Sequence, residues 1–110
     1  MKQYVIDELR PEDHDRIKMY MDEHFGPADM GDIYWISVDP GLYDPIQLSH
    51  VKCRPFYFTI QLTPTSLVAE LLVRTKNSIR CDCIQYATKD QCLWLIRFVD
   101  TIFERLEIIT

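Results

Sequence analysis

Three cysteines and one histidine are of the residue types that bind zinc. His50 and Cys53 stand three positions apart, and Cys81 and Cys83 flank a single residue, Asp82. One imidazole and three thiolates make up a complete tetrahedral zinc set, and the first pair has a spacing common among zinc ligands. The residue types therefore permit a metal site, and the spacing of the second pair decides whether it forms.

That spacing argues against zinc if Cys81 and Cys83 lie on a strand. Two residues on one strand face stand about 6–7 Å apart, because each residue adds about 3.3 Å. Thiolates that share a zinc ion are under about 4 Å apart, since each lies about 2.3 Å from the metal. A turn or bulge at Asp82 would be needed. We therefore expect both cysteines to be small buried core residues, with no metal cofactor, and keep zinc binding as an alternative.

A reactive thiol is the second possibility. Cys53 lies between Lys52 and Arg54 and follows His50 closely, and basic neighbours activate a thiol. No third residue that would orient a catalytic base is recognisable. A small enzyme using Cys53 and His50 stays an alternative, and no catalytic residue is assigned.

Two carboxylates are expected to face each other on the open face of a sheet, where Glu70 would stand opposite Asp82. Two acids at cross-strand distance repel unless a cation, a metal or a shared proton lies between them. The simpler interpretation is a surface ladder neutralised by arginines, and the alternative is a polar binding surface. The candidate ligand-binding residues of this surface are Tyr57, Thr59, Glu70, Arg74, Arg80 and Asp82.

The remaining histidines and the familiar motifs assign no reaction. His14 and His24 are ten residues apart, nearly three helical turns, which is too far to share one metal. The chain has no glycine-rich phosphate loop, no Gly-x-Ser-x-Gly elbow and no His-Glu-x-x-His motif.

Length, composition and charge limit the class of protein. The 110 residues allow one domain, over residues 1–110, and 47% hydrophobic with 26% charged residues is typical of a globular chain. The net charge of -5 argues against nucleic acid as a partner. The chain shows no signal-peptide pattern and no apolar run long enough for a membrane. We therefore expect a cytoplasmic protein with reduced cysteines and no membrane partner.

Hydrophobic spacing predicts the elements that position these residues. Pro11 is expected to open a helix, because the first helical position has no hydrogen bond to lose, and Gly26 to end it. Thr88 and Gln91 form a capping box at the start of the last helix. Helices are predicted over 11–25 and from 88 to about 106, strands over 3–9, 32–39 and 56–62, and one short helical turn over 44–50.

The end of the sheet is predicted to be a hairpin of strands 67–74 and 78–86, which completes a three-stranded meander with the strand before it. Apolar residues alternate with polar ones in both segments. Because apolar side chains should share a face, one register is favoured over a slip by one residue. Its cross-strand pairs are Val73 with Ile79 and Leu71 with Cys81.

The last helix has apolar residues on two sides. One stripe is expected to cover the sheet, and the second, which includes Trp94 and Phe98, needs another surface. We expect a second subunit there, with the apolar end of the chain taking part. The predicted interface residues are Trp94, Phe98, Ile108 and Ile109.

These elements predict an α+β fold with a single mainly antiparallel sheet of about five strands and two main helices on one face. The predicted function is a small non-enzymatic binding or interaction module that forms a homodimer. The alternatives are a zinc-binding protein, or a small enzyme that uses Cys53 and His50 or the open sheet face with Glu70 and Asp82.

Overall fold

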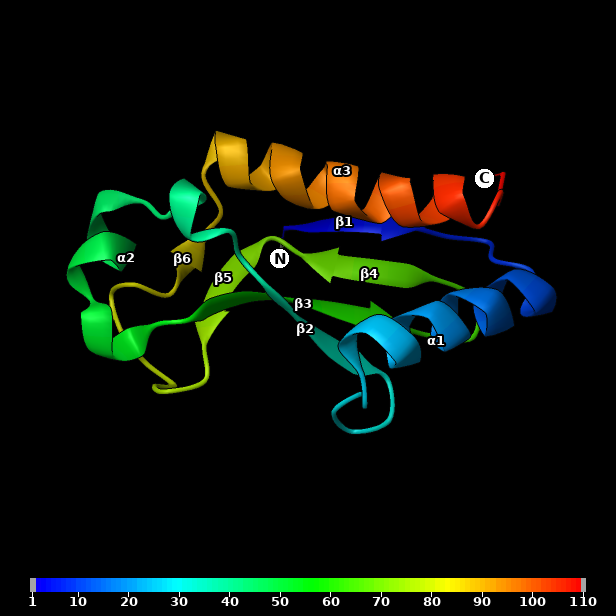
Figure 1. Cartoon of the computed structure of the whole chain (residues 1–110), viewed down its shortest axis with the longest axis horizontal. Coiled ribbons are helices and arrows are strands. Elements are labelled where there is room, and N and C mark those ends of the chain that lie inside the picture. The colour runs from blue at the N-terminus through cyan, green and yellow to red at the C-terminus, as the bar shows by residue number, and fades with distance from the viewer. Residues whose placement is uncertain (1, 110) are drawn as a thin grey trace.

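The computed structural model describes residues 2–109 and confirms the α+β fold class, with one mainly antiparallel sheet and helices packed on it (Figure 1). The sheet has six strands, one more than expected. Two short 3-10 helices are η1 (Pro40–Leu42) and η2 (Val51–Cys53). The other elements are β1 (Gln3–Ile6), α1 (Pro11–Phe25), β2 (Ile33–Ser37), α2 (Pro45–Ser49), β3 (Phe56–Leu62), β4 (Leu67–Glu70), β5 (Leu72–Thr75), β6 (Gln85–Tyr86) and α3 (Lys89–Arg105).

Both long helices begin where their sequence signals place them. α1 starts at Pro11 and stops before Gly26, whose N–H caps the last turn. α3 starts after Thr88, whose hydroxyl accepts a hydrogen bond from the backbone N–H of Gln91. The Gln91 side chain accepts one in return from the Thr88 N–H. This reciprocal pair satisfies two backbone donors that the first helical turn leaves free.

β3 is the central strand of the sheet. It pairs antiparallel with β2 on one side and with β4 and β5 on the other. β1 continues the sheet beside β4, and β6 continues it beside β5. β3 therefore has neighbours along both edges, and its inward side chains form the middle of the core.

β4 and β5 are one long strand interrupted at Leu71. Ile60 of β3 pairs with Ala69. Tyr57 pairs with Arg74, two positions beyond the residue that an unbroken register would place there. Two extra residues thus enter the strand at the break. Because the number is even, inward and outward side chains keep their faces on both sides of it.

The predicted strand over 78–86 is wrong. Only β6 is a strand in this segment, and it pairs with Leu72 and Val73. The residues from 76 to 84 form a loop, with the Ile79 side chain 94% exposed. The predicted pairs Val73–Ile79 and Leu71–Cys81 are therefore absent. The alternation of apolar residues in 78–86 does not reflect a buried face, because Ile79 points to solvent.

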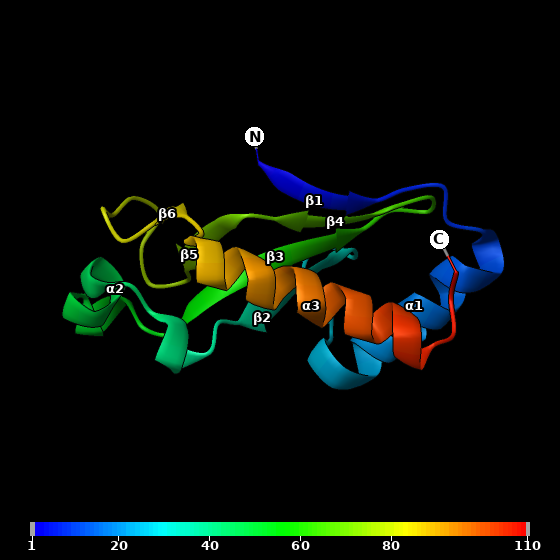
Figure 2. The same cartoon turned by 90° about the horizontal axis from the view of Figure 1, so that it is seen from above.

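The inward face of the sheet packs against α1 and α3. Figure 2 shows α3 crossing over the sheet, with its C-terminal end beside α1. The inward strand residues are fully or almost fully buried, as expected for a face covered by amphipathic helices. The largest buried hydrophobic side chains of this core are Tyr34, Ile36, Phe56, Phe58, Ile60 and Leu67 from the strands and Ile17, Met21, Leu95 and Ile102 from the helices.

A buried pair of glutamines attaches α2 to the start of α3. Gln47 and Gln91 occupy the same position in two capping boxes. The Gln91 Nε2 donates to Gln47 Oε1 at 2.9 Å and to the carbonyl of Leu42 at 2.8 Å. Both side chains are at most 1% exposed, so a lost hydrogen bond here would leave a buried polar group unpaired. This contact fixes α2 and the residues that follow it.

Candidate metal centre

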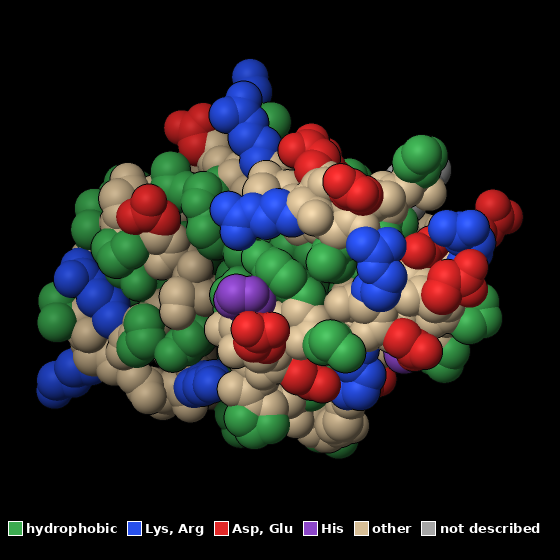
Figure 3. Space-filling model, turned by 45° about the vertical axis from the view of Figure 1, so that its right-hand side comes forward, with side chains coloured by type: hydrophobic (Ala, Val, Ile, Leu, Met, Phe, Trp, Pro, Cys, Tyr) green, Lys and Arg blue, Asp and Glu red, His purple; other side chains and the backbone are tan. Residues whose placement is uncertain are grey.

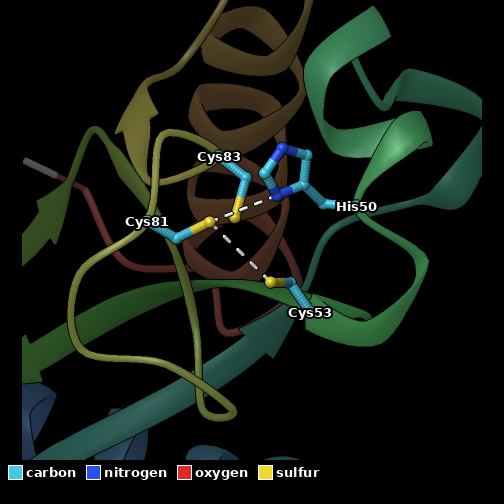
Figure 4. Close-up of side chains that lie close together, drawn as sticks. All are labelled: His50, Cys53, Cys81 and Cys83. Atoms are coloured by element: carbon cyan, nitrogen blue, oxygen red, sulfur yellow. Dashed lines mark hydrogen bonds between the residues drawn. The ribbon is translucent and has the colours of Figure 1, made fainter.

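Four side chains from two separate segments converge at one end of the sheet. His50, Cys53, Cys81 and Cys83 each offer a donor atom, and these atoms lie within 4.8 Å of one another. Figure 4 shows the side chains pointing toward a common centre, two from the α2–η2 segment and two from the loop before β6. The cluster is the set of residue types that the sequence singles out for zinc.

A turn at Asp82 brings the two loop sulfurs together. The N–H of Ile84 donates to the carbonyl of Cys81 at 3.0 Å, which closes a turn over 81–84. A strand would have held the two cysteines about 6–7 Å apart. The spacing on the predicted strand was the reason to expect no zinc site. The structure has a turn there instead, so that reason no longer applies. Cys83 is fully buried, as expected, whereas Cys81 is only half-buried.

The first pair of donors is positioned by consecutive short helices. His50 is both the C-cap of α2 and the N-cap of η2, and Cys53 is the last residue of η2. The Cys53 N–H donates to the carbonyl of His50 at 3.0 Å. This single 3-10 turn places the imidazole and the thiol on the same side of the segment.

Side-chain hydrogen bonds hold the two segments against each other. The Thr75 hydroxyl donates to the carbonyl of Cys53, and it accepts from the N–H of Asn77 at 3.1 Å. The Asn77 amide donates to the carbonyls of Lys52 at 3.2 Å and Arg54 at 2.9 Å. These hydrogen bonds therefore anchor the loop that contains Cys81 to the segment that contains Cys53, and none of them involves a metal ligand's side chain.

The distances within the cluster match a tetrahedral centre. The sulfurs of Cys53 and Cys81 are 3.9 Å apart, and the Cys81 sulfur is 3.2 Å from Nδ1 of His50. In a tetrahedron with zinc–sulfur bonds of about 2.3 Å, two sulfurs lie about 3.8 Å apart. These two distances are close to those around one zinc ion, and every other pair of donor atoms lies within 4.8 Å.

The two loop thiols differ in their electrostatic environment. Hydrogen bonds from the backbone and side chain of Cys83 lower the pKa of Cys81 to about 7. Burial raises the pKa of Cys83 to about 12, and the hydrogen bond with Cys81 acts in the same direction. The thiolate form is therefore favoured at Cys81 and disfavoured at Cys83. A bound zinc ion changes this, because a coordinating thiol is deprotonated outright.

Comparisons with protein-family models, curated proteins and solved structures gave no match. The geometry of this chain therefore carries the functional argument by itself. Among residues 2–109, no helix combines the length and apolarity needed to cross a membrane.

The open sheet face gathers only part of its predicted binding surface. Tyr57, Thr59, Glu70 and Arg74 lie on the outward side of β3, β4 and β5, whereas Arg80 and Asp82 are exposed in the loop. Glu70 stands opposite Gln3 of β1, so the predicted pair with Asp82 does not form. The Glu70 carboxylate instead accepts a hydrogen bond from Arg74 at 2.7 Å.

Trp35 and Lys76 also belong to this open face and were not among its predicted residues. The Trp35 ring meets Tyr57 edge-on, and the Lys76 ammonium lies over both rings, 5.0 and 4.8 Å from their centroids. The alternation in β2, with Tyr34 and Ile36 buried, was the signal that Trp35 points outward. The aromatic faces are therefore occupied by a cation of the chain itself.

The predicted interface residues separate into three environments. Trp94 and Phe98 are half-buried on α3. Ile108 is packed into the core of its own chain at 8% exposure, while Ile109 is 94% exposed. A homodimer through these residues stays a prediction, and Ile108 is already covered within the single chain.

If this cluster binds zinc, Asn77 is expected to affect the affinity without contacting the metal. Asn77→Asp removes the two amide donors that anchor the loop to the Cys53 segment. We expect zinc affinity to fall about tenfold, at the lower end of the effect of outer-shell groups, as measured by competition with a chromophoric chelator. Gln61→Glu removes the amide donor to Asp32 on a strand away from the cluster and serves as the control. Equal losses in both variants would contradict this role.

Proposed function

We propose that this chain is a zinc protein, in which one ion is bound by His50, Cys53, Cys81 and Cys83. The observation that carries the proposal is the convergence of four donor atoms within 4.8 Å from segments about thirty residues apart in the chain. Cysteines that serve only as core residues need no such arrangement.

The ligand types favour zinc over other metals. Three thiolates and one imidazole form a soft donor set, whereas calcium and magnesium take oxygen ligands. Zinc has no geometric preference from its d electrons and accepts a tetrahedron of this kind. No carboxylate belongs to the cluster found among the described residues.

The number of ligands favours a structural role over catalysis. A catalytic zinc keeps one position for water or substrate and has three protein ligands, whereas a structural zinc is closed by four. Here the protein itself supplies four. The alternative of a Cys53 nucleophile with His50 as base has less support, because the His50 ring is hydrogen-bonded to Cys81.

The proposed ion would organise the end of the molecule that has little regular structure. It would join the α2–η2 segment to the loop at 76–84, which is followed by the two-residue strand β6. Binding to the folded state stabilises that state in proportion to the logarithm of the free metal concentration. The chain would then present a zinc-ordered surface, consistent with a binding module rather than an enzyme.

Cobalt substitution tests this proposal. Protein purified without chelator should contain one zinc per chain, and replacement by Co²⁺ should give the strong visible absorption of a tetrahedral cobalt thiolate centre. Cys92 lies outside the cluster, with its thiol against the carbonyl of Ala87, so Cys92→Ser should give the same spectrum. A weak octahedral cobalt spectrum, or metal-free protein that takes up no zinc, would overturn the proposal.

A further inference from the structure

A groove between α1 and α3 has none of the metal-cluster residues in its lining. It has a volume of about 650 Å³, which is in the range of small-molecule sites. The last two turns of α1 form one wall and the second stripe of α3 forms the other. Figure 3 shows hydrophobic side chains gathered around a hollow beside a histidine, with Lys and Arg side chains at its edge.

The floor of the groove is a continuous row of aromatic rings. Trp94 stacks on Phe98 with centroids 5.6 Å apart, and Phe98 meets Phe25 of α1 edge-on at 5.4 Å. Behind them, Trp94 stacks on the buried Phe58 of β3. The rings therefore pack against the core as well as against one another. A flat apolar body would find a preformed surface here.

Two arginines that have no acidic partner among residues 2–109 border the same groove. Arg97 and Arg105 are exposed and lie eight residues apart on α3, about 12 Å along the helix axis. Among residues 2–109 neither forms an ion pair. The Arg105 guanidinium only reaches the Tyr20 hydroxyl, at 3.4 Å. One acid, Asp90, lies at the opposite end of the lining from Arg105.

We propose that this groove binds a small organic anion with an aromatic or aliphatic body. The apolar part would lie on the rings of Trp94 and Phe98, and a carboxylate, sulfonate or phosphate would bind Arg97 or Arg105. Guanidinium groups form charge-assisted, often bidentate, hydrogen bonds with such anions. Apolar burial gives this ligand its affinity, and the arginines select for the negative charge.

A second copy of the chain fits the groove less well than an anion does. A two-fold interface along α3 would bring the same surface of both copies together. Where the two-fold axis passes near Thr101, Arg97 of one copy would face Arg105 of the other, and these like charges would repel. The anion instead neutralises them, and this charge complementarity decides between the two occupants.

Two fluorescent dyes that differ in one charge test the proposal. Anilinonaphthalene sulfonate is the anionic probe, and N-phenylnaphthylamine has the same rings without the sulfonate. The protein is the zinc-loaded full chain with Trp35→Phe, which leaves Trp94 as the single tryptophan of the two. We expect one equivalent of the sulfonate to bind and to quench Trp94 by energy transfer.

The arginine variants separate charge recognition from apolar binding. Arg97→Gln with Arg105→Gln should weaken the sulfonate about tenfold and change the neutral dye by less than about twofold. Lys89→Gln removes one charge from the first turn of α3, outside the groove lining, and should leave both dyes unchanged. Both arginines are exposed, so the fold should tolerate the change.

Three results would overturn the proposal. The first is equal loss of both dyes in the arginine variants, because the groove would then not recognise charge. The second is uptake of the sulfonate without energy transfer from Trp94, which would place the dye elsewhere. The third is a dimer in sedimentation velocity that the arginine variants alter, which would assign the groove to a second copy of the chain.

Discussion

Cys81→Ser is expected to lower zinc affinity by at least about a hundredfold, more than the loss of an outer-shell partner costs. The serine hydroxyl is a poor zinc ligand at neutral pH, and only three ligands of the set would remain. Cys92→Ser is the matched control, because it makes the same substitution at a half-buried cysteine outside the cluster. Chelator competition measures both affinities.

The same variant is expected to separate zinc-dependent from zinc-independent stability. With free zinc at about a hundred times the dissociation constant, binding adds about 2.7 kcal/mol to the free energy of unfolding. Urea titrations with and without zinc should show this difference in the unchanged chain and in Cys92→Ser, but not in Cys81→Ser. A zinc-dependent gain of equal size in all three proteins would contradict the assigned ligand.

Phe58→Ala is expected to lower the free energy of unfolding by about 3–5 kcal/mol, as for large aromatic residues in other cores. Phe58 is fully buried in the central strand β3 and stacks on Trp94 of α3. Its removal opens a cavity between the sheet and that helix. Urea or thermal denaturation measures the loss.

Tyr57→Ala is the comparison for Phe58→Ala, because the two rings are neighbours on opposite faces of β3. Tyr57 is half-buried and touches Trp35 and Lys76 on the open face. Its loss should cost clearly less than the loss of Phe58. Equal costs would mean that the open face is also covered, for instance by another copy of the chain.

The elements with strong local signals were predictable from the sequence. Pro11 and the pair of Thr88 and Gln91 mark helix starts by satisfying or sparing backbone donors, and both helices begin there. The alternation over 56–62 predicts β3 with its observed bounds. In these segments, the local hydrogen bonds and the pattern of buried side chains favour the same secondary structure.

The segment 78–86 was not predictable by the same reasoning. Ile79, Cys81 and Cys83 alternate as in a strand, but their spacing has other causes. Ile79 is exposed at a loop tip, and the two cysteines converge across a turn. The turn-forming character of Asn77 and Asp82 was the available signal. The residue types offered zinc binding as an alternative, and the wrongly predicted strand argued against it.

The groove between α1 and α3 was also predictable only in part from the sequence. The second stripe of α3, with Trp94 and Phe98, follows from helical spacing alone. The stripe was expected to need a partner, and part of that partner is Phe25 at the end of α1 in the same chain. The spacing of apolar residues does not predict that α1 packs beside α3, because this depends on how both helices lie on the sheet.

X-ray absorption at the zinc edge tests the central claim most directly. The zinc-loaded chain should show three sulfurs at about 2.3 Å and one nitrogen at about 2.0 Å from the metal. Its spectrum should keep this first shell in Cys92→Ser and lose one sulfur in Cys81→Ser. A shell of only nitrogen and oxygen neighbours, or one unchanged by Cys81→Ser, would contradict a zinc centre built from His50, Cys53, Cys81 and Cys83.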